Sequence, residues 1–259
     1  MEPKVLIVIP ARFKSTRYPA KPLVEIKGCT GISKPLVQRS WEAAMEVKGV
    51  SRVVVATDNS SIQEVAQSFG ADVIMTSESC RNGTERCAEV VEQLSAEGEN
   101  YDLVVNLQGD APLTPHIFVE SLIQSLTENS HCDVATPAVL SSNTVLQALI
   151  NDRKAGRVGG TTVVFGEDQR ALYFSKEVIP FCEAPSPEAR VYHHLGVYAY
   201  RPSALAAYAR SDQCTAEKME GLEQIRCLNV GVPVRCTGLP HSDCWERNSP
   251  EHLPIIGER

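Results

Sequence analysis

The sequence predicts an α/β fold: a mixed, mainly parallel open sheet with helices on both faces, plus a smaller β-hairpin and loop subregion. Short apolar runs alternate with longer stretches of helical periodicity through the first half of the chain. The first run, VLIVI at 5–9, is apolar throughout, as expected of a strand buried on both faces. A chain of 259 residues with 43% hydrophobic and 22% charged residues can bury the core that such a fold needs.

The first half predicts strands and helices in alternation. The predicted helix at 35–47 places Leu36, Val37, Trp41 and Ala44 at helical spacing. In order along the chain we expect strand 5–9, helix 35–47, strand 52–57, helix 60–69, strand 71–75, helix 84–94 and strand 103–107. Ligands of an open sheet of this kind bind beyond the carboxyl ends of the strands, so the loops after these strands are the candidate functional segments.

The second half is less regular. We expect strand 133–139, a hairpin of 163–165 with 171–174, a loop over 180–190, strand 195–200, helices 204–210 and 219–228, strand 233–236 and a short helix near Pro250. No internal repeat and no clear linker interrupts the chain. The expectation is therefore one domain over 1–259, with 1–130 and 131–259 as its two functional halves.

Charge and composition narrow the class of protein. The chain has 25 Lys+Arg against 32 Asp+Glu, a formal net charge of −7, which argues against nucleic acid or an anionic membrane as the main partner. No segment approaches the roughly 20 apolar residues that span a bilayer, and the apolar run near the N-terminus is too short for a signal-peptide core. We expect a soluble, cytoplasmic protein.

The nine cysteines form no C-x-x-C pair, which leaves a zinc ribbon or a thioredoxin-like motif without support. The expected state is reduced thiols that act as small hydrophobic side chains.

The loop after the first strand is unusually basic. Within 10–23, four cationic side chains (Arg12, Lys14, Arg17 and Lys21) fall within ten residues of a net acidic chain. Cations and free backbone amides at a strand's carboxyl end suit a polyphosphate. The segment is neither a Walker A loop nor a G-x-G-x-x-G turn, so P-loop hydrolase and Rossmann dehydrogenase lose support. The alternative is a solvated basic surface loop.

Gln108-Gly109-Asp110 follows the strand at 103–107. An acid at this place can hold Mg²⁺ against phosphate oxygens, because Mg²⁺ takes one or two carboxylates plus substrate phosphates. The alternative is that Asp110 caps the helix that follows Pro112.

The segment 76–86 follows the strand at 71–75. Gly83 and Thr84 open the helix at 84–94, and Arg81 and Arg86 flank its start. A helix N-terminus can bind an anion or a base edge. The alternative is that Thr84 is only an N-cap. If these loops meet at one edge of the sheet, cations and a metal-binding acid there fit a nucleoside-triphosphate site used for nucleotidyl transfer.

Multi-residue motifs over nearly the whole chain carry a family resemblance. The motifs are IPARFKSTRYPAKPL (9–23), ATDN (56–59), GADVIMTS (70–77), NGTER (82–86), LQGDAPL (107–113), ALYFSKEVIP (171–180), YHHLGVYAYR (192–201) and GLEQIR (221–226). Together they resemble the CMP-Kdo synthetases, the 3-deoxy-manno-octulosonate cytidylyltransferases.

The resemblance implies a nucleotidyltransferase-like fold, a homodimer, and transfer of CMP from CTP to an acidic sugar. Arg12, Lys21 and Asp110 would be the catalytic residues, with Arg12 and Lys21 on the CTP phosphates and Asp110 on Mg²⁺. The implied nucleotide contacts are Pro10, Ala11, Arg12, Lys21, Met75, Thr76, Arg81, Gly83, Thr84, Arg86 and Gln108. The implied acceptor contacts are Gln108, Lys176, His194, Tyr198, Glu223 and Gln224.

Several positions depart from the family pattern. Ala111 stands where QGDEP has its glutamate, and Asn248 stands where a C-terminal motif has an aspartate that is a second Mg²⁺ ligand. An amide oxygen at Asn248 can bind Mg²⁺ but supplies no charge, and Asp243 or Glu246 is an alternative ligand. Lys176 replaces the usual arginine, and a lysine cannot bind a carboxylate through two parallel hydrogen bonds as an arginine does. The usual Arg-His is His193-His194.

The implied reaction is direct displacement at the α-phosphorus of CTP, driven by positioning and charge neutralisation rather than by a protein nucleophile. Two alternatives stay open. The acceptor could be a different acid, such as 8-amino-Kdo, another ulosonate or a phosphonate. The chain could also bind CTP without catalysis, which the changes at Ala111 and Asn248 motivate.

Overall fold

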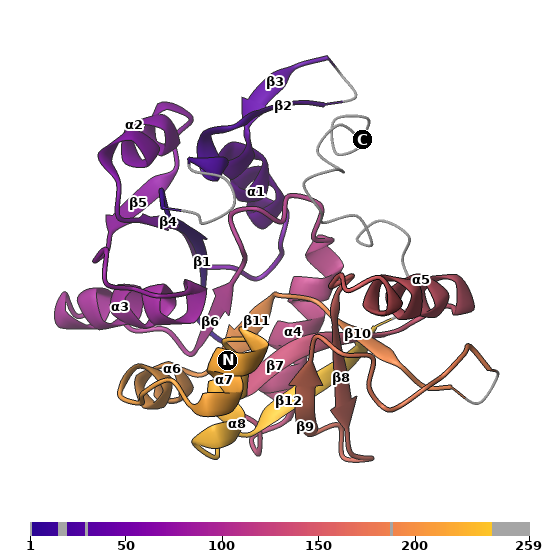
Figure 1. Cartoon of the computed structure of the whole chain (residues 1–259). Coiled ribbons are helices and arrows are strands. Elements are labelled where there is room, and N and C mark those ends of the chain that lie inside the picture. Colours follow the sequence, from indigo (N-terminus) through magenta and orange to yellow (C-terminus); the bar gives the residue numbers. More distant parts are fainter. Residues whose placement is uncertain (1, 15–19, 29–30, 187–188, 240–259) are drawn as a thin grey trace. The chain divides into compact units, whose positions relative to one another are not determined.

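The computed structural model describes residues 2–14, 20–28, 31–186 and 189–239. The described residues up to Glu120 form one compact unit, unit 1, and those from Ser121 form a second, unit 2. The boundary lies inside helix α4 (His116–Glu128), near the position at which the sequence analysis divides the chain into halves. Figure 1 shows the elements of both units.

Unit 1 is built on four parallel strands in the order β5 (Asp72–Met75), β4 (Arg52–Thr57), β1 (Val5–Ala11) and β6 (Leu103–Asn106). Ile7 of β1 pairs with Val53 on one side and Val105 on the other. Each residue from Val5 to Ile9 is fully buried, because strands flank β1 on both edges and helices cover its faces. The apolar run at the start of the sequence is therefore the centre of this sheet.

Three helices cover the strands of unit 1: α1 (Leu36–Met45), α2 (Ser60–Ser68) and α3 (Gly83–Ala96). The side chain of Asn59 accepts from two amides at the start of α2, and that of Asn82 accepts from the Glu85 amide in α3. Right-handed crossovers place α1 and α2 on one face and α3 on the other, as seen in Figure 1. The predicted helices on both faces are confirmed.

Three short elements in unit 1 were not predicted: the 3₁₀ turn η1 (Lys21–Leu23) and the antiparallel strands β2 (Glu25–Lys27) and β3 (Ser33–Pro35). Each has only three residues, which is too short for any periodicity to be read. The turn η1 ends the basic loop, and β2 and β3 connect it to α1.

Unit 2 is mostly antiparallel. Its central strand, β7 (Val134–Leu140), pairs in parallel with β12 (Val234–Leu239) and antiparallel with β11 (Tyr198–Tyr200) and β10 (Tyr192–His194). The hairpin of β8 (Thr161–Phe165) and β9 (Ala171–Ser175) continues from β10. The predicted hairpin is confirmed, and the predicted mixed α/β class is confirmed with it.

Two predicted elements of unit 2 are wrong in extent. Only 198–200 of the predicted strand 195–200 is a strand, β11, and β10 at 192–194 was not predicted. His194 pairs with Ala138 and Ala199 with Ala135, so the five residue steps from β10 to β11 lie opposite three steps of β7, and the extra residues form a bulge. The predicted helix 219–228 is two helices, α7 (Thr215–Glu220) and α8 (Ile225–Asn229). Gly221 has a φ of +61°, a left-handed conformation that ends α7.

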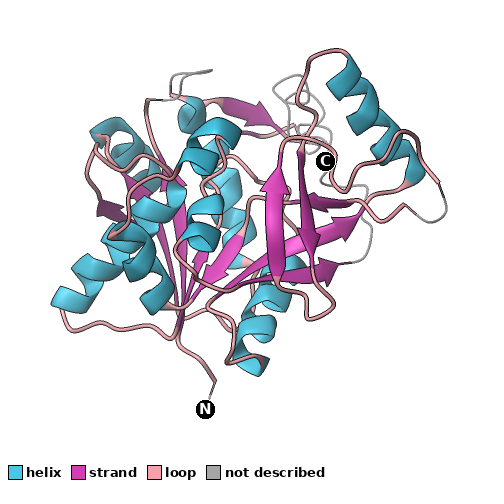
Figure 2. Ribbon diagram, turned by 60° about the horizontal axis from the view of Figure 1, so that its bottom comes forward, coloured by secondary structure: helices cyan, strands magenta, loops and turns pink. Residues whose placement is uncertain are grey.

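The remaining helices of unit 2 are α5 (Asn143–Lys154), which the sequence analysis missed, and α6 (Pro202–Ala209). Figure 2 shows the helices packed on the strands in both units. The short helix predicted near Pro250 lies outside the described residues. Among the described helices, none combines the length and the apolar character required to cross a bilayer.

Candidate functional site

The loop that follows β6 is pressed against the end of β1 at the carboxyl edge of the unit 1 sheet. A Cβ at Gly109 would lie 2.7 Å from the carbonyl oxygen of Pro10, so only glycine permits this approach. The Ser40 hydroxyl of α1 is buried and donates to the carbonyl of Gly109 at 3.0 Å. These contacts fix the place of Asp110, the next residue, relative to the end of β1 and to α1.

Lys21 and Asp110 form an ion pair at this edge. The Lys21 Nζ lies 2.6 Å from Asp110 Oδ2, and the two side chains are 29% and 48% exposed. Their predicted ligands are phosphate for Lys21 and Mg²⁺ for Asp110, and the structure brings the two side chains together from positions 89 residues apart. Because both remain partly exposed, an anion can approach the ammonium and a cation can approach the carboxylate.

The residues of this edge fit an Mg²⁺ ion that is held mainly by substrate. No group of three His, Cys, Asp or Glu side chains among the described residues could hold a metal ion by itself. Asp110 offers one accessible carboxylate, which is the protein share that Mg²⁺ takes when phosphates supply further ligands. Asn248, the second predicted ligand, lies outside the described residues, as do Asp243 and Glu246.

The basic loop also meets the segment that leads into α3. The exposed Arg12 guanidinium donates to the carbonyl of Arg81 at 3.3 Å. The Arg81 guanidinium is bound in turn by Glu85, with Nε 2.8 Å from Oε1. Arg12 and Arg81, both predicted nucleotide contacts, are therefore neighbours.

Arg86, another predicted nucleotide contact, is directed into the protein. Its side chain is 2% exposed, and its guanidinium donates to the Thr76 hydroxyl and, at 2.9 Å, to Asp58 Oδ2. The other Asp58 oxygen accepts from the backbone amide of Phe13 at 3.3 Å. Asp58 was not predicted as a site residue, although it directly follows β4 and therefore lies at the carboxyl end of a strand like the predicted loops.

A cluster of amides lies behind the start of α3. A Cβ at Gly83 would be 2.8 Å from Gln108 Nε2 and 3.0 Å from Asn106 Nδ2, so both amide groups pack closely against this glycine. Gln108 Nε2 donates to Asn106 Oδ1 at 3.2 Å. Asn106 is fully buried, and its Nδ2 has no hydrogen-bond partner among the described residues. Asn106 was not predicted, because a lone amide at the end of an apolar strand gives no motif.

The other predicted nucleotide residues lie around the same edge. Met75 ends β5 and is 39% exposed, whereas Thr84, in the first turn of α3, is 1% exposed. Ala11 ends β1 and is buried. All the described residues predicted to bind nucleotide thus belong to unit 1, and their contacts with a nucleotide stay predictions.

The predicted acceptor residues, apart from Gln108, belong to unit 2. His194 of β10 is 5% exposed, and its Nε2 lies 2.9 Å from the hydroxyl of Thr136. The same hydroxyl reaches the Val197 carbonyl at 2.9 Å, so Thr136 donates there and accepts from a proton on His194 Nε2. Burial, helped by His193, lowers the pKa of His194 from 6.5 to about 3. At neutral pH this imidazole provides a hydrogen bond and no charge.

The neighbours of His194 are aromatic and largely buried. Its ring centroid lies 4.9 Å from that of Phe174 and 5.5 Å from that of Tyr198. Burial raises the pKa of Tyr198 well above its usual range, so this phenol stays protonated. The part of the predicted acceptor site formed by His194 and its neighbours is therefore mostly uncharged.

Glu223 and Gln224 stand at the start of α8. The Tyr208 hydroxyl donates to the Glu223 carbonyl at 3.2 Å, which holds this turn. Gln224 is 3% exposed, and its Nε2 has no hydrogen-bond partner among the described residues. Lys176 is half-buried, and its backbone amide donates to Glu220 at 2.9 Å.

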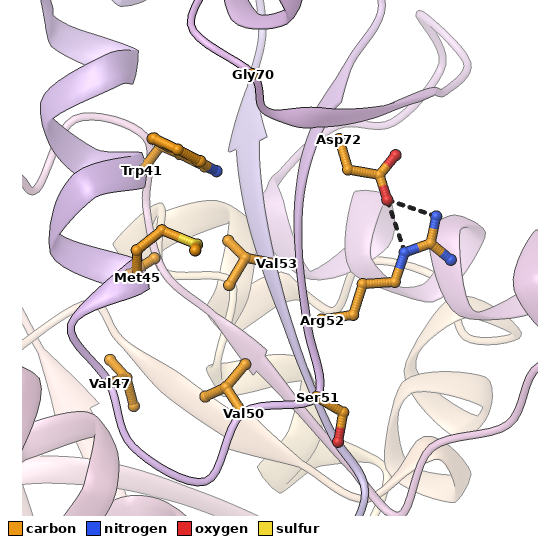
Figure 3. Close-up of a pocket in the computed structure, with 10 residues that line it drawn as sticks. Trp41, Met45, Val47, Val50, Ser51, Arg52, Val53, Gly70 and Asp72 are labelled. Carbon is orange, nitrogen blue, oxygen red and sulfur yellow. Dashed lines mark hydrogen bonds and ion pairs between the residues drawn. The ribbon is translucent and has the colours of Figure 1, made fainter.

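A separate pocket of about 270 Å³ lies in unit 1 at the opposite end of β4. Figure 3 shows Trp41, Met45 and Val53 around it, with the Arg52–Asp72 ion pair at its side. It opens at the amino ends of β4 and β5, away from the loops described above, and forms no part of the candidate site.

Comparison with known proteins decides the family. A cytidylyltransferase family model matches residues 6–234. The chain belongs to the cytidylyltransferase family. It is 39% identical over 249 residues to the 3-deoxy-manno-octulosonate cytidylyltransferase of Maricaulis maris (strain MCS10), covering 95% of this chain and 93% of the relative. The enzyme of the same name from Escherichia coli is 37% identical over 232 residues, 90% of this chain and 86% of the relative.

Solved structures agree with this family. CMP:2-keto-3-deoxy-manno-octonic acid synthetase complexed with CTP superposes with a TM-score of 0.81 at 34% identity, over 98% of this chain and 97% of that chain. A 4-diphosphocytidyl-2C-methyl-D-erythritol synthase from Anaerococcus prevotii DSM 20548, with a TM-score of 0.56 at 12% identity, shares the fold alone; the match covers 98% of this chain and 94% of that one. The predicted family and the predicted nucleotidyltransferase-like fold are confirmed, and this cytidylyltransferase is a CTP-dependent enzyme by family.

Proposed function

We propose that this cytidylyltransferase transfers CMP from CTP to the anomeric hydroxyl of 3-deoxy-D-manno-octulosonate (Kdo), giving CMP-Kdo and pyrophosphate. We propose further that it does so in the cytoplasm, as a homodimer. The relatives reported above, named for this sugar acid and at least 34% identical, support Kdo as the acceptor.

One observation in the structure carries the proposal. The Lys21–Asp110 pair stands at the carboxyl edge of the unit 1 sheet, at 2.6 Å and partly exposed, where Gly109 lets the loop after β6 approach the end of β1. A cation next to an accessible carboxylate at this edge suits a triphosphate and the metal that accompanies it.

In the proposed step, the acceptor hydroxyl oxygen forms a bond to the α-phosphorus of CTP. The bond from that phosphorus to the bridging oxygen of the β-phosphate breaks, pyrophosphate leaves, and the hydroxyl proton is released to solvent. Arg12 and Lys21 would bind and orient the phosphates, so that little covalent work is left to the protein. Asp110 would hold Mg²⁺, which supplies charge neutralisation on the phosphate oxygens when bound; Asn248 is the second predicted ligand.

In unit 2, Lys176 is the one cation among the described residues that we assign to the acceptor. It would bind the carboxylate of the sugar acid. His194, Tyr198, Glu223 and Gln224 would orient the hydroxyls by neutral or acceptor hydrogen bonds, and the unpartnered amide of buried Gln224 supports such a role.

The direct experiment measures pyrophosphate release and identifies the product by mass spectrometry, with the purified chain, CTP, MgCl₂ and Kdo. We expect CMP-Kdo, and no pyrophosphate when Kdo is left out. A panel of 8-amino-Kdo, other ulosonates and phosphonates tests the alternative acceptors.

Turnover of one of these acids with none of Kdo would contradict the proposed acceptor. CTP binding without pyrophosphate release with any acid would contradict catalysis and favour the non-catalytic alternative.

A further inference from the structure

We propose that Asp58 is a positioning residue for the nucleotide phosphates, acting through the loop that carries Arg12. This inference rests on the proposed function and adds to it a residue that touches neither substrate nor metal. It concerns the ATDN motif at 56–59, whose acid lies at the carboxyl end of β4.

Asp58 joins three segments of unit 1 with its two oxygens. Oδ1 accepts from the Phe13 amide at 3.3 Å, directly after Arg12 in the basic loop. Oδ2 accepts from the Arg86 guanidinium at 2.9 Å, in the first turns of α3. The same guanidinium donates to Thr76, at the end of β5. One carboxylate thus ties the basic loop to the strand and helix beside it.

Burial makes this tie strong. The Asp58 and Arg86 side chains are only 11% and 2% exposed. A buried guanidinium needs a compensating charge, and a hydrogen bond to a charged acceptor is stronger than one to a neutral group. Arg86 therefore holds Asp58 in one orientation, and Asp58 holds the Phe13 amide.

The other side-chain contacts described for residues 12–14 of the basic loop are more exposed. The Arg12 guanidinium reaches the Arg81 carbonyl at 3.3 Å, and Lys14 pairs with Glu78 at 2.7 Å with both side chains mostly exposed. Exposed pairs of this kind contribute little to fixing a loop. Of the side-chain contacts described for residues 12–14, the Asp58 bond is the one with a largely buried partner, so the direction of Arg12 depends on it.

The test compares Asp58→Ala and Asp58→Asn with a matched control, Asp72→Asn. Asp72 is likewise a carboxylate paired with an arginine, Arg52, but this pair lies at the amino ends of β4 and β5. Initial rates are measured with CTP and Kdo varied in turn, and folding is checked by circular dichroism and urea unfolding.

We expect Asp58→Ala to raise the KM for CTP at least about tenfold while the KM for Kdo changes less than about twofold. Asp58→Asn keeps an acceptor for the Phe13 amide but loses the charge, and we expect about a threefold rise. Asp72→Asn should stay within twofold. If Asp58→Ala does not fold, Asp58→Asn decides the test. A folded variant with an unchanged KM for CTP, or with both KM values raised equally, would overturn the proposal.

A double-mutant cycle with Arg12→Ala separates positioning from a general structural effect. If Asp58 acts through Arg12, Asp58→Ala should change the KM for CTP less than about twofold once Arg12 is already removed. If the fold-increases in the KM for CTP of the two single variants multiply fully in the double variant, Asp58 does not act through Arg12.

A calorimetric titration of CTP and Mg²⁺ into the same proteins distinguishes failure of the Asp58 proposal from failure of the proposed function. A wild-type chain that binds CTP but transfers no CMP to Kdo overturns the proposed function alone. In that case the dissociation constants for CTP replace the KM values, with the same expected ratios.

Discussion

The two candidate regions of the molecule use ion pairs in opposite ways. In unit 1, Lys21 and Asp110 pair at the strand edge with 29% and 48% of their side chains exposed. In unit 2, Arg226 and Glu217 pair at 2.6 Å with 0% and 3% exposed, and the Tyr208 ring lies 4.0 Å from the guanidinium. The exposed pair can exchange its partners for phosphate and metal, whereas the buried pair cannot.

The difference follows from what each region is proposed to bind. A triphosphate needs accessible cations, and the unit 1 edge offers Arg12 and Lys21 on loops. An acceptor recognised by its hydroxyls needs fixed neutral donors and acceptors, and unit 2 offers His194 and Tyr198 on strands. The buried Arg226–Glu217 pair then serves to hold α7 and α8, which flank the turn bearing Glu223 and Gln224.

The largest expected difference between the regions is in stability. Glu217→Gln leaves the Arg226 guanidinium buried without its counter-charge, which typically costs about 3–5 kcal/mol. Lys21→Met removes an exposed pair, for which about 1 kcal/mol or less is expected. Urea unfolding of both variants measures the two losses. Equal losses of unfolding free energy in the two variants would show that the buried and the exposed pair contribute alike to stability.

Enzymatic activity should show the opposite ranking, with the exposed Lys21–Asp110 pair more important than the buried pair. Asp110→Asn removes the charge proposed to hold Mg²⁺ and should lower kcat for pyrophosphate release at least about 100-fold, the scale on which a lost electrostatic contact acts. Its free energy of unfolding should change by no more than about 1 kcal/mol, because the carboxylate is half exposed. Asp72→Asn is the control, with activity close to wild type. Full activity of Asp110→Asn with Mg²⁺ would remove Asp110 from the metal site.

The fold of unit 1 was largely predictable, and the reason is local. Apolar runs such as those within 5–9 and 52–57 belong to parallel strands, and the helices that follow β4 and β5 begin at polar caps, Asn59 and Asn82. The antiparallel unit 2 was predicted less well. Its β10 and β11 are three residues each and are separated by a bulge, which no sequence period reveals.

The candidate site was predictable where a motif is charged and sequential, as in the basic loop and Gln108-Gly109-Asp110. Contacts that depend on tertiary structure were not predictable. The burial of Arg86 against Asp58 joins residues 28 positions apart, and the unpartnered Asn106 amide has no sequence signature. That His194 is buried, and therefore neutral, could likewise be learned only from the sheet around it.

The buried histidines predict how stability depends on pH. Burial lowers the pKa of His193 from 6.5 to about 4 and that of His194 to about 3. Below pH 6.5 the unfolded chain binds protons that the folded chain does not, so stability falls as the pH falls toward these values. From pH 6.5 to 5 we expect a loss of about 2 kcal/mol for each histidine.

Urea unfolding at pH 7.5 and 5.0 measures this loss. His194→Gln should remove about half of the part of the pH dependence that the two histidines cause. A variant with the same pH dependence as wild type would show that His194 is protonated in the folded protein.

The most direct measurement of the central claim, that charge at the unit 1 edge binds CTP and unit 2 binds the acceptor, uses matched substitutions in the two regions. Lys21→Met and Lys176→Met each remove one ammonium and keep a chain of similar length. Initial rates with CTP and Kdo varied in turn should show about a tenfold higher KM for CTP in Lys21→Met, and about a tenfold higher KM for Kdo in Lys176→Met. The other KM of each variant should stay within about twofold. If either substitution shifts both KM values together, or shifts the one assigned to the other region, the division of labour between the two units is wrong.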